Sequence, residues 1–497
     1  MKLEDKNKVI SIDIGATSGR IMEVSLGKSG EISYKEVKRF QNKVMKISDT
    51  LYWDINYLLN EIFDTLEKVD KDIKSIAIST WGCDICLLDE NGDLIDNPRC
   101  YRDEHNVIVQ KEFSKRYFPY QEVYEITGIQ NLPFNTIYQL LYLRDYKSDI
   151  YQKINTILMI PDYIAYVLTG KKRIEETNAS TTALYDVTEK SFSKSILDKL
   201  DIKSEIFPPI INPGDSYGLL KDDLRKKFNL GNVEVIACAT HDTGSAVMGS
   251  LQNKETAYLS SGTWSLLGVL IDSPIKTKIA MQENYTNEIG YDSKVRFLKN
   301  IMGMWLLEEY RRELAEEKID NSFETILKEF NDKSEKISLI DPDDEIFLTV
   351  GNMSKRIDQF IDKTNQKKLL SRKEYIQTIY YSLAYKYRFV FEKMSKIVGK
   401  KYSRLNIVGG GAKNDLLSQL VADILQIEVI SGPIEATVLG NSIVQFLHHK
   451  LVKTDDIHNL ILSSDKNIKI FKPNVELKEY YDNKYNEFLK LLEVKNG

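Results

Sequence analysis

Apolar runs, glycine-containing turns and amphipathic stretches follow one another along the chain and predict a succession of strands and helices. The segment VISIDIGATSGRIMEVSLGKSGEISYKEVKRF (9–40) reads as three strands joined by two glycine turns. An amphipathic helix is predicted over 57–69, and an apolar strand over 74–82. Helical periodicity then dominates from about residue 110 to residue 169.

The strand–turn–strand pattern of the first segment returns in the second half of the chain. TAYLSSGTWSLLGVLI (256–271) has the same form, and setting Gly15 against Gly262 superposes one turn on the other. Strand, glycine loop and helix are then predicted over 404–425 and again over 427–447. These similarities indicate an internal repeat. The charged stretch Glu309–Lys336 is predicted to be a solvent-exposed helical excursion.

Length and composition limit the classes of protein that the chain can represent. A chain of 497 residues exceeds one ordinary core, so two domains are predicted, over residues 1–249 and 250–497. The net charge is -5 and the lysines are dispersed, so no nucleic-acid partner is expected. The absence of an apolar signal region and of an apolar run of membrane-spanning length predicts a cytoplasmic protein without a membrane partner. The pattern does not indicate an oligomeric state.

The cysteines and histidines do not form a recognisable metal motif in the sequence. Cys83 and Cys86 make one C-x-x-C, but a zinc site needs a second ligand pair at matching spacing. Among the five histidines, His448 and His449 are the only adjacent pair. The C-x-x-C is interpreted as packing, and a redox protein remains a weak alternative because no thioredoxin-like context surrounds it.

Two carboxylates stand where apolar strands are predicted. Asp242 follows an apolar run in VIACATHDTGSAVMG (235–249), where an acid either caps the next helix or carries a function. Asp13, inside the first strand, faces either a partner or a bound cation. Glycine loops at strand ends suggest phosphate binding, although the P-loop and dinucleotide-binding motifs are absent. Trp81 and Trp264 either stack on a bound ligand or fill the core.

Motifs spread over nearly the whole chain resemble the FGGY carbohydrate kinases, members of the duplicated actin-like ATPase superfamily. They are DIGATSGR (13–20), STWGCD (79–84), YRD (101–103), TGIQNLPFNTIYQL (127–140), MIPDYIAYVLTG (159–170), THDTGSAV (240–247), YLSSGTWSLLG (258–268), LKNIMGMWLL (298–307), IVGGGAKNDLL (407–417) and GPIEATVLGN (432–441). GIQNLPFNTIYQL and LKNIMGMWLL favour the rhamnulokinase branch of the family. The chain departs from the pattern of that branch at Glu308, at His105 and in the CDIC stretch after Gly82.

The resemblance implies an α/β fold of two duplicated, ribonuclease H-like domains, with mixed sheets flanked by helices and an interdomain cleft. It implies ATP-dependent phosphorylation of L-rhamnulose to L-rhamnulose 1-phosphate in L-rhamnose catabolism, with ATP, Mg²⁺ and a small-molecule ketose bound. Asp242 is then the general base, and Asp13 acts on Mg²⁺ through water. The implied substrate-binding residues are Gly82, His241, Asp242, Thr243 and Asn300. The implied nucleotide-binding residues are Ala16, Thr17, Ser18, Gly19, Arg20, Thr263, Glu308, Gly410 and Gly411.

Two alternatives to the L-rhamnulose assignment stay open at this point. The same chemistry fits another ketose or polyol, such as L-fuculose or L-xylulose. A non-catalytic actin-like nucleotide switch belongs to a different class of protein. The intact Asp242 argues against the switch, because a switch needs no base directed at a sugar hydroxyl.

Overall fold

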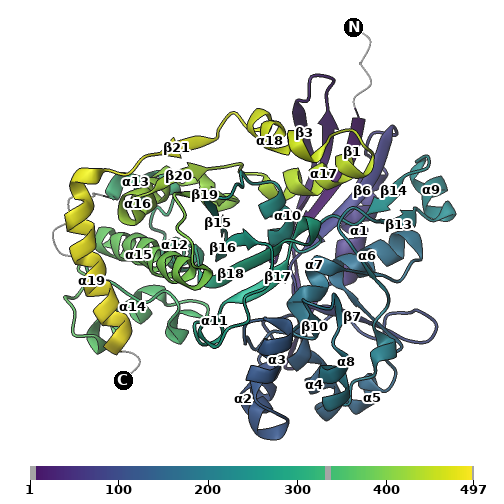
Figure 1. Cartoon of the computed structure of the whole chain (residues 1–497), viewed down its shortest axis with the longest axis horizontal. Helices are drawn as coiled ribbons and strands as arrows, with labels where there is room; N and C mark the ends of the chain where they lie inside the picture. The colour runs from purple at the N-terminus through teal and green to yellow at the C-terminus, as the bar shows by residue number, and fades with distance from the viewer. Residues whose placement is uncertain (1–6, 331–336, 495–497) are drawn as a thin grey trace. The chain divides into compact units, whose positions relative to one another are not determined.

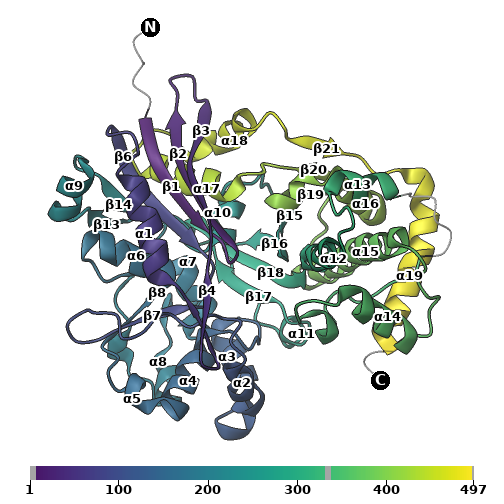
Figure 2. The same cartoon turned by 180° about the vertical axis from the view of Figure 1, so that it is seen from behind.

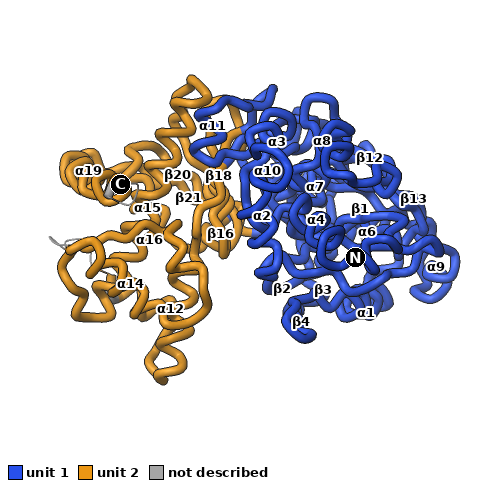
Figure 3. The backbone as a smooth tube through the Cα atoms, turned by 90° about the horizontal axis from the view of Figure 1, so that it is seen from below, with its two compact units in different colours: residues 1–251, 270–298, 435–466 blue, residues 252–269, 299–434, 467–497 orange. Residues whose placement is uncertain are grey.

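The structure, a computed structural model, describes residues 7–330 and 337–494, which form two compact units (Figure 3). Unit 1 comprises Met1–Leu251, Leu270–Leu298 and Glu435–Lys466, and unit 2 comprises Gln252–Val269, Lys299–Ile434 and Asn467–Gly497. The predicted contiguous division at residues 249 and 250 therefore differs from these units in two segments. Residues 270–298 and 435–466 come late in the chain but fold with its beginning.

Unit 1 is built around a six-stranded mixed sheet in the order β13-β14-β6-β1-β2-β3 (Figure 1). Its elements are β1 (Asn7–Ile14), β2 (Ser18–Leu26), β3 (Ile32–Gln41), β4 (Val44–Ile47), β5 (Thr50–Trp53), α1 (Ile55–Leu66), β6 (Ile73–Thr80), β7 (Ile85–Leu88), α2 (His105–Arg116), α3 (Tyr120–Thr127), α4 (Thr136–Tyr146), α5 (Ser148–Tyr151), β8 (Thr156–Met159), α6 (Ile160–Thr169), β9 (Ile174–Glu175), α7 (Glu176–Ala179), β10 (Tyr185–Asp186), β11 (Ser191–Phe192), α8 (Lys194–Lys199), β12 (Ile210–Ile211), β13 (Ser216–Leu219), α9 (Asp222–Phe228), β14 (Glu234–Ile236), α10 (Asp242–Met248), α11 (Lys278–Gln282), β17 (Thr286–Ile289), α17 (Ala436–His448) and α18 (Ile457–Ser464). β1 is buried along most of its length, which explains its nearly continuous apolar sequence.

Unit 2 contains the strand succession β16-β15-β19-β20-β21 and a group of longer helices. Its elements are β15 (Thr256–Ser261), β16 (Trp264–Ile271), β18 (Val295–Met302), α12 (Trp305–Glu316), α13 (Phe323–Glu329), α14 (Met353–Lys363), α15 (Arg372–Val398), β19 (Arg404–Val408), α16 (Asp415–Leu425), β20 (Glu428–Ser431), β21 (Lys469–Phe471) and α19 (Lys478–Val494), of which β16 and β18 also extend into unit 1. A capping box between Ser371 and Glu374 begins α15, and Gly399 in the left-handed region ends it.

The internal repeat indicated by the sequence appears in the strand pairing of each unit. In unit 1, β2 and β1 pair antiparallel, β1, β6 and β14 pair parallel, and β13 joins antiparallel. In unit 2, β16, β15, β19, β20 and β21 follow the same succession. Each aligned glycine also closes its turn through its amide, although the second turn is one residue shorter: Gly15 donates to the Ser18 carbonyl and Gly262 to the Trp264 carbonyl, each at 2.9 Å. Each unit thus carries one copy of the repeat.

Helices on both faces complete the unit 1 sheet: α10 and α17 lie on the face toward the viewer in Figure 1, and α1 lies on the face seen in Figure 2. α17 is fastened to the sheet by side-chain amides. Gln445 donates to the Ile10 carbonyl at 3.0 Å and accepts from Ser75 at 2.7 Å. Asn441 donates to the Ala77 carbonyl at 3.3 Å. These buried bonds explain why residues 435–466 belong to unit 1.

The structure confirms most predicted elements with small shifts of their ends. The helix predicted over 57–69 is α1, which starts earlier because Asp54 caps it by accepting from the Tyr57 amide at 2.9 Å. The charged stretch after residue 309 is helical in α12 and α13, but its predicted exposure is wrong for α12. There, Glu309 is buried and accepts from the Gly351 amide at 2.8 Å. Residues 331–336 of that stretch lie outside the described residues.

Among the described helices, none combines the length and the hydropathy needed to cross a membrane.

The contact between α10 and α17 makes a first prediction. An alanine Cβ at position 440 would lie 1.9 Å from the Ser245 carbonyl oxygen and 2.7 Å from the Gly249 amide nitrogen. Glycine to alanine inside a helix normally stabilises by about 1 kcal/mol, but overpacking of this severity destabilises by about 3 kcal/mol. Gly440→Ala should therefore lower the urea midpoint of unit 1, followed through the fluorescence of Trp53 and Trp81 in a background where Trp264 and Trp305 are replaced by Phe.

The matched control is Gly231→Ala, because a Cβ at Gly231 meets no atom within 4 Å. This variant should unfold at the wild-type midpoint. Equal midpoints for the two variants would show that the close approach of α10 and α17 does not limit stability.

Candidate active site

Asp242 is the first residue of α10, which follows β14 after the buried segment 237–241. His241 is the N-cap of this helix, so the interpretation of Asp242 as the capping residue is wrong. The Oδ1 atom of Asp242 accepts from the Thr243 amide at 2.6 Å and lies 3.2 Å from Thr243 Oγ1. Oδ2 receives no hydrogen bond from the described residues, and the side chain is 31% exposed. The carboxylate is thus fixed through one oxygen and open at the other.

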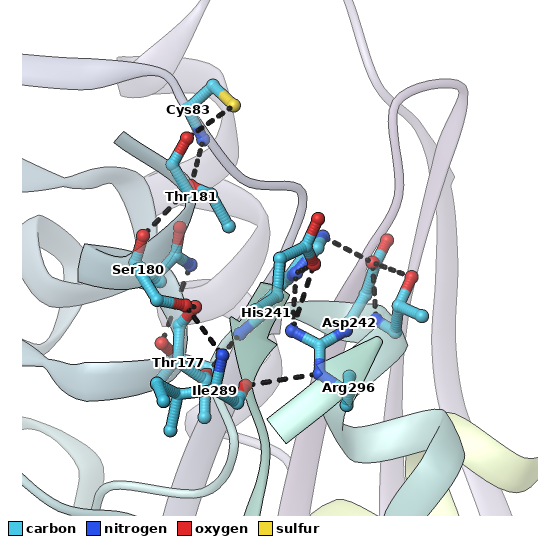
Figure 4. Close-up of polar contacts among 12 residues, drawn as sticks. Cys83, Thr177, Ser180, Thr181, His241, Asp242, Ile289 and Arg296 are labelled. Carbon is cyan, nitrogen blue, oxygen red and sulfur yellow. Dashed lines mark hydrogen bonds and ion pairs between the residues drawn. The ribbon is translucent and has the colours of Figure 1, made fainter. Parts of the chain in front are cut away.

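A second, fully buried carboxylate positions the turn that carries Asp242. Glu175 accepts from the Thr240 amide at 3.0 Å and from Thr240 Oγ1 at 2.5 Å. It also accepts from the amide and hydroxyl of Thr177, at 2.8 and 2.5 Å. Thr177 Oγ1 in turn receives the His241 amide at 3.2 Å (Figure 4). Burial raises the pKa of Glu175, and these donors oppose the rise.

His241 stands between Asp242 and a buried ion pair (Figure 4). Its Nδ1 lies 3.0 Å from Arg296 and 3.2 Å from Glu288, while Nε2 lies 3.6 Å from Asp242 Oδ1. Arg296 has no exposed side-chain surface, pairs with Glu288 at 3.1 Å and donates to the Ile289 carbonyl at 3.1 Å. Burial acts to raise the pKa of Glu288, but Arg296 and His241 outweigh it and the pKa is lowered. The imidazole is therefore held from one side and free toward Asp242.

Asp13 and Arg20 are directly opposite each other on β1 and β2. Asp13 Oδ2 accepts from Arg20 Nε at 2.9 Å and lies 2.8 Å from its second terminal nitrogen. Arg20 also pairs with Glu435. Burial raises the pKa of Asp13; Arg20 opposes this rise, and the nearby Asp242 adds to it. Of the two alternatives that the sequence left open for Asp13, the structure shows a side-chain partner, Arg20. The Oδ1 atom of Asp13 receives no hydrogen bond from the described residues.

The turn that holds Gly82 is packed against the segment after α7. A Cβ at Gly82 would lie 3.0 Å from Thr181 Oγ1, so only a glycine fits without displacing that side chain. The next residue, Cys83, adopts a φ of 72° and donates its amide to Thr181 Oγ1 at 3.1 Å (Figure 4). All four cysteines are buried and unpaired, and burial raises the pKa of Cys83 and Cys86, which disfavours redox chemistry.

Asp84, in the same turn, accepts hydrogen bonds from two buried indoles, one of them from β5. Its Oδ2 accepts from Trp53 Nε1 at 2.6 Å and from Trp81 Nε1 at 2.9 Å, and its Oδ1 accepts from Gln139 at 2.9 Å. The two indole rings lie with their centroids 4.3 Å apart. Trp81 is 6% exposed, so the structure favours core packing for it. Burial raises the pKa of Asp84 to about 7 against the pull of these donors.

The first glycine hairpin, in unit 1, exposes a polar tip. Thr17 and Ser18 are exposed at the β1–β2 turn, whereas a Cβ at Gly19 would lie 2.3 Å from the Phe40 ring. Ala16 and Arg20 are half-buried on either side. The hairpin therefore presents backbone and hydroxyl groups on a tightly packed base.

The triple-glycine loop and the remaining predicted residues lie in unit 2. A Cβ at Gly411 would lie 2.0 Å from Ser261 Oγ, while Gly410 has open space around it. The Thr263 carbonyl accepts from the Gly303 amide at 3.2 Å. Glu308 pairs with Arg311 at 2.8 Å and is 46% exposed. Asn300 Oδ1 is buried without a hydrogen-bond partner among the described residues.

The structure brings together the predicted residues of unit 1, and it adds four charged residues that sequence reasoning did not single out. These are Asp84, Glu175, Glu288 and Arg296. Asp84 had a signal, a lone acid in the apolar run CDICLL. The other three had none. Glu175 bonds to the distant Thr240, and Glu288 and Arg296 face each other across paired strands, a register that their sequence does not reveal.

Two family models match the chain, one in its N-terminal half and one in its C-terminal half. The model for the N-terminal domain of the FGGY family of carbohydrate kinases matches residues 8–249, and the model for its C-terminal domain matches residues 257–449. The chain belongs to the FGGY family of carbohydrate kinases. Membership confirms the predicted family, and it makes the protein a carbohydrate kinase rather than a nucleotide switch or a redox protein.

Two rhamnulokinases and one solved kinase structure show what this FGGY kinase is similar to. The rhamnulokinase of Enterococcus faecalis is 37% identical over 492 residues, 98% of each chain. The rhamnulokinase of Bacillus subtilis is 37% identical over 471 residues, 93% of this chain and 95% of the relative. Among solved structures, the gluconate kinase of Lactobacillus acidophilus superposes with a TM-score of 0.81 at 19% identity, over 99% of this chain and 98% of that one. This last similarity confirms the predicted two-domain α/β fold.

The buried pair beside His241 makes a second prediction. Arg296→Gln should destabilise unit 1 by about 3–5 kcal/mol, because Glu288 then stays buried without its cation. The urea midpoint should fall accordingly, and Arg296→Lys should recover only part of the loss because it cannot bond both Ile289 and Glu288 in the same fork.

The control is Lys294→Gln, two residues away, whose ion pair with Asp272 is 45% and 86% exposed on the two sides. It should change stability by at most about 1 kcal/mol. A midpoint for Arg296→Gln as high as that of the control would show that the buried pair contributes little.

The raised pKa of Asp84 makes a third prediction, on pH. The folded carboxyl keeps its proton up to about pH 7, whereas the unfolded one loses it near the ordinary value of 3.8. Unfolding therefore releases a proton between these values, and stability falls as the pH rises through this window and is level above it. Wild type should lose up to about 4 kcal/mol more than Asp84→Asn between about pH 4 and pH 7.

The measurement is the urea midpoint against pH for wild type, Asp84→Asn and a control, Asp64→Asn, whose side chain is 62% exposed. The control should follow the wild-type curve. Parallel curves for wild type and Asp84→Asn would mean that the N–H donors of Trp53, Trp81, Gln139 and the Tyr101 backbone keep Asp84 ionised throughout.

Proposed function

We propose that this FGGY kinase transfers the γ-phosphoryl group of ATP to the 1-hydroxyl of L-rhamnulose, forming L-rhamnulose 1-phosphate and ADP. The rhamnulokinases named above support the sugar, since each matches nearly the full chain at 37% identity. That support disfavours L-fuculose, L-xylulose and other polyols as the main substrate. The observation that carries the chemistry is the fixed but open carboxylate of Asp242.

Asp242 is suited to act as the general base. Thr243 orients the carboxylate through Oδ1, which leaves Oδ2 to accept the proton of the sugar hydroxyl. As the oxygen of the sugar hydroxyl bonds to the γ-phosphorus, the bond from phosphorus to the β,γ-bridging oxygen breaks and ADP leaves. Because the transition state is loose, the protein contributes mainly by positioning the reacting groups. A well-placed base increases the rate by about 10²–10⁴.

The groups around Asp242 orient the sugar in this proposal. His241, whose Nδ1 lies against the Arg296–Glu288 pair, offers Nε2 to a sugar hydroxyl. Gly82 leaves space in the turn packed on Thr181, and Thr243 lies beside the base. Asn300 has a buried, unpartnered Oδ1, which an additional sugar hydroxyl would satisfy.

Nucleotide binding is assigned in the same proposal to the residues that the family resemblance implies. Residues 16–20 form the first hairpin, and the amides and hydroxyls at its exposed tip, Thr17 and Ser18, suit phosphate oxygens. Gly410, which has open space around it, and Gly411 accommodate the nucleotide close to the backbone. Thr263 lies in the glycine turn between β15 and β16, which is the unit 2 counterpart of the β1–β2 hairpin. Glu308, half-exposed in the first turn of α12, is the weakest member of the set because its charge repels phosphate.

The residues present fit Mg²⁺ bound together with ATP. Asp13 offers a hard oxygen at Oδ1, and burial raises the pKa of this carboxyl, so a cation nearby favours the ionised form. When bound, Mg²⁺ neutralises phosphate charge. Arg20 holds Asp13 in place from β2, and Asp13 would meet the ion through water.

The fourth prediction tests the base. Asp242→Asn should lower kcat for L-rhamnulose with Mg-ATP by about 10²–10⁴, with KM changed by only a few-fold and the melting temperature unchanged. Asparagine keeps an oxygen for Thr243 but cannot accept the proton. ADP release measured by a coupled assay gives kcat and KM, and Asp272→Asn, 86% exposed, is the control.

A panel of L-rhamnulose, L-fuculose, L-xylulose and glycerol separates the sugar from the chemistry. A preference for L-rhamnulose in kcat/KM supports the full proposal. A preference for another sugar, lost in Asp242→Asn, keeps the base and refutes the L-rhamnulose assignment. Undiminished turnover by Asp242→Asn would refute the base itself.

A further inference from the structure

A second cluster of polar side chains lies in unit 1 at the far end of α17. Glu435, just before this helix, pairs with Arg20 at the proposed active site. His448 and His449 stand at its other end, about 20 Å along the helix axis. They face Glu234 at the start of β14, and one ligand atom of each of the three residues lies within 4.8 Å of the others. The proposed function uses none of these three residues.

Hydrogen bonds orient two of the three side chains. His448 Nδ1 lies 2.8 Å from the Gly214 carbonyl, which can only accept, so Nδ1 carries the proton. The neutral ring then presents the lone pair of Nε2, which lies 3.3 Å from Glu234 Oε2. Ser216 donates to the other oxygen, Glu234 Oε1, at 3.1 Å. A lone pair and a carboxylate oxygen face each other here, and this arrangement needs a positive charge: a proton on His448 or a metal ion.

The third side chain favours the metal ion over the proton. Nε2 of His449 is buried and has no hydrogen-bond partner among the described residues. A proton shared by His448 and Glu234 leaves this buried nitrogen unsatisfied, whereas a metal ion would bind all three side chains. A backbone carbonyl behind a ligating imidazole is also the usual outer support of a metal-bound histidine.

We propose that Glu234, His448 and His449 bind a divalent transition-metal ion, Zn²⁺ by preference. Two histidines and one carboxylate, with water in a fourth position, form a common zinc ligand set. Tetrahedral ligands about 2.05 Å from zinc are about 3.3 Å apart, which is the separation of His448 Nε2 and Glu234 Oε2. His449 has to turn slightly to complete the site. The ion would tie α17 to β14 and to the loop at Gly214.

Lys74 is the opposing charge near this site. It is exposed on β6 and acts electrostatically on His449. Its positive charge would repel a metal ion, so Lys74→Gln should bind the ion more tightly than the wild-type protein does. The proposal can therefore be tested by a gain of metal affinity in this variant as well as by a loss of affinity in variants of the three ligands.

The fifth prediction is measured by metal binding to the full chain, freed of any purification tag and of metal. In buffer with excess Mg²⁺, Zn²⁺ titrated by calorimetry should bind with a stoichiometry of one and raise the melting temperature. His449→Gln, which breaks no hydrogen bond, should weaken binding at least 10-fold and abolish the thermal shift. Glu234→Gln should weaken it similarly, while Lys74→Gln should strengthen it several-fold.

The matched control is His458→Gln, an exposed histidine on α18 in the same unit, which should bind Zn²⁺ as wild type does. Co²⁺ in place of Zn²⁺ should give visible absorption bands of a four-coordinate site that His449→Gln lacks. The proposal is overturned if wild type binds no Zn²⁺ at micromolar concentration, which leaves a protonated His448 paired with Glu234. It is also overturned if His449→Gln binds as tightly as wild type.

Discussion

The buried carboxylate of Glu175 is the interaction on which the proposed active site of unit 1 depends. It joins β9 to the turn before α10 through four short bonds to Thr177 and Thr240, and so sets where His241 and Asp242 begin their helix. A carboxylate buried this deeply is costly unless its oxygens are bonded. Because both oxygens accept hydrogen bonds, the cost of burying the carboxylate is offset, and the turn before α10 is held rigidly.

The same principle recurs around the site with other charges. Glu288 is stabilised by Arg296 and His241, Asp13 by Arg20, and Asp84 by two indoles and an amide. Glu288 and Arg296 lie against His241, and Asp13 pairs with Arg20, so these charges fix groups that the proposed reaction uses, whereas Asp84 fixes indoles of the core. Electrostatic preorganisation of this kind requires no rearrangement during phosphoryl transfer. By contrast, Asp242 keeps one oxygen free, as a base must.

Duplication explains how one topology serves two tasks in an FGGY carbohydrate kinase. Both units carry the same succession of strand pairings and a glycine turn after the first strand. In the proposed function, unit 1 holds the base and most of the sugar contacts, while the glycine loop of unit 2 serves the nucleotide. α17 completes the first sheet from late in the chain, and the proposed zinc site would fasten its far end.

Sequence by itself determined the elements, the repeat, the family and Asp242 as the outstanding acid. It could do so because hydrophobic periodicity, glycine turns and short motifs are local properties of neighbouring residues. Only the tertiary structure decided that Asp242 is not the helix cap, that Arg20 is the partner of Asp13, and that Glu175, Glu288 and Arg296 support the site. It alone brought Glu234 to His448 and His449, more than 200 residues apart in the chain. The reason is physical: strand register and burial choose the partner of a buried charge. That partner lies on the next strand for Asp13 and Glu288 and in a distant segment for Glu175 and Glu234, and no local pattern records the choice.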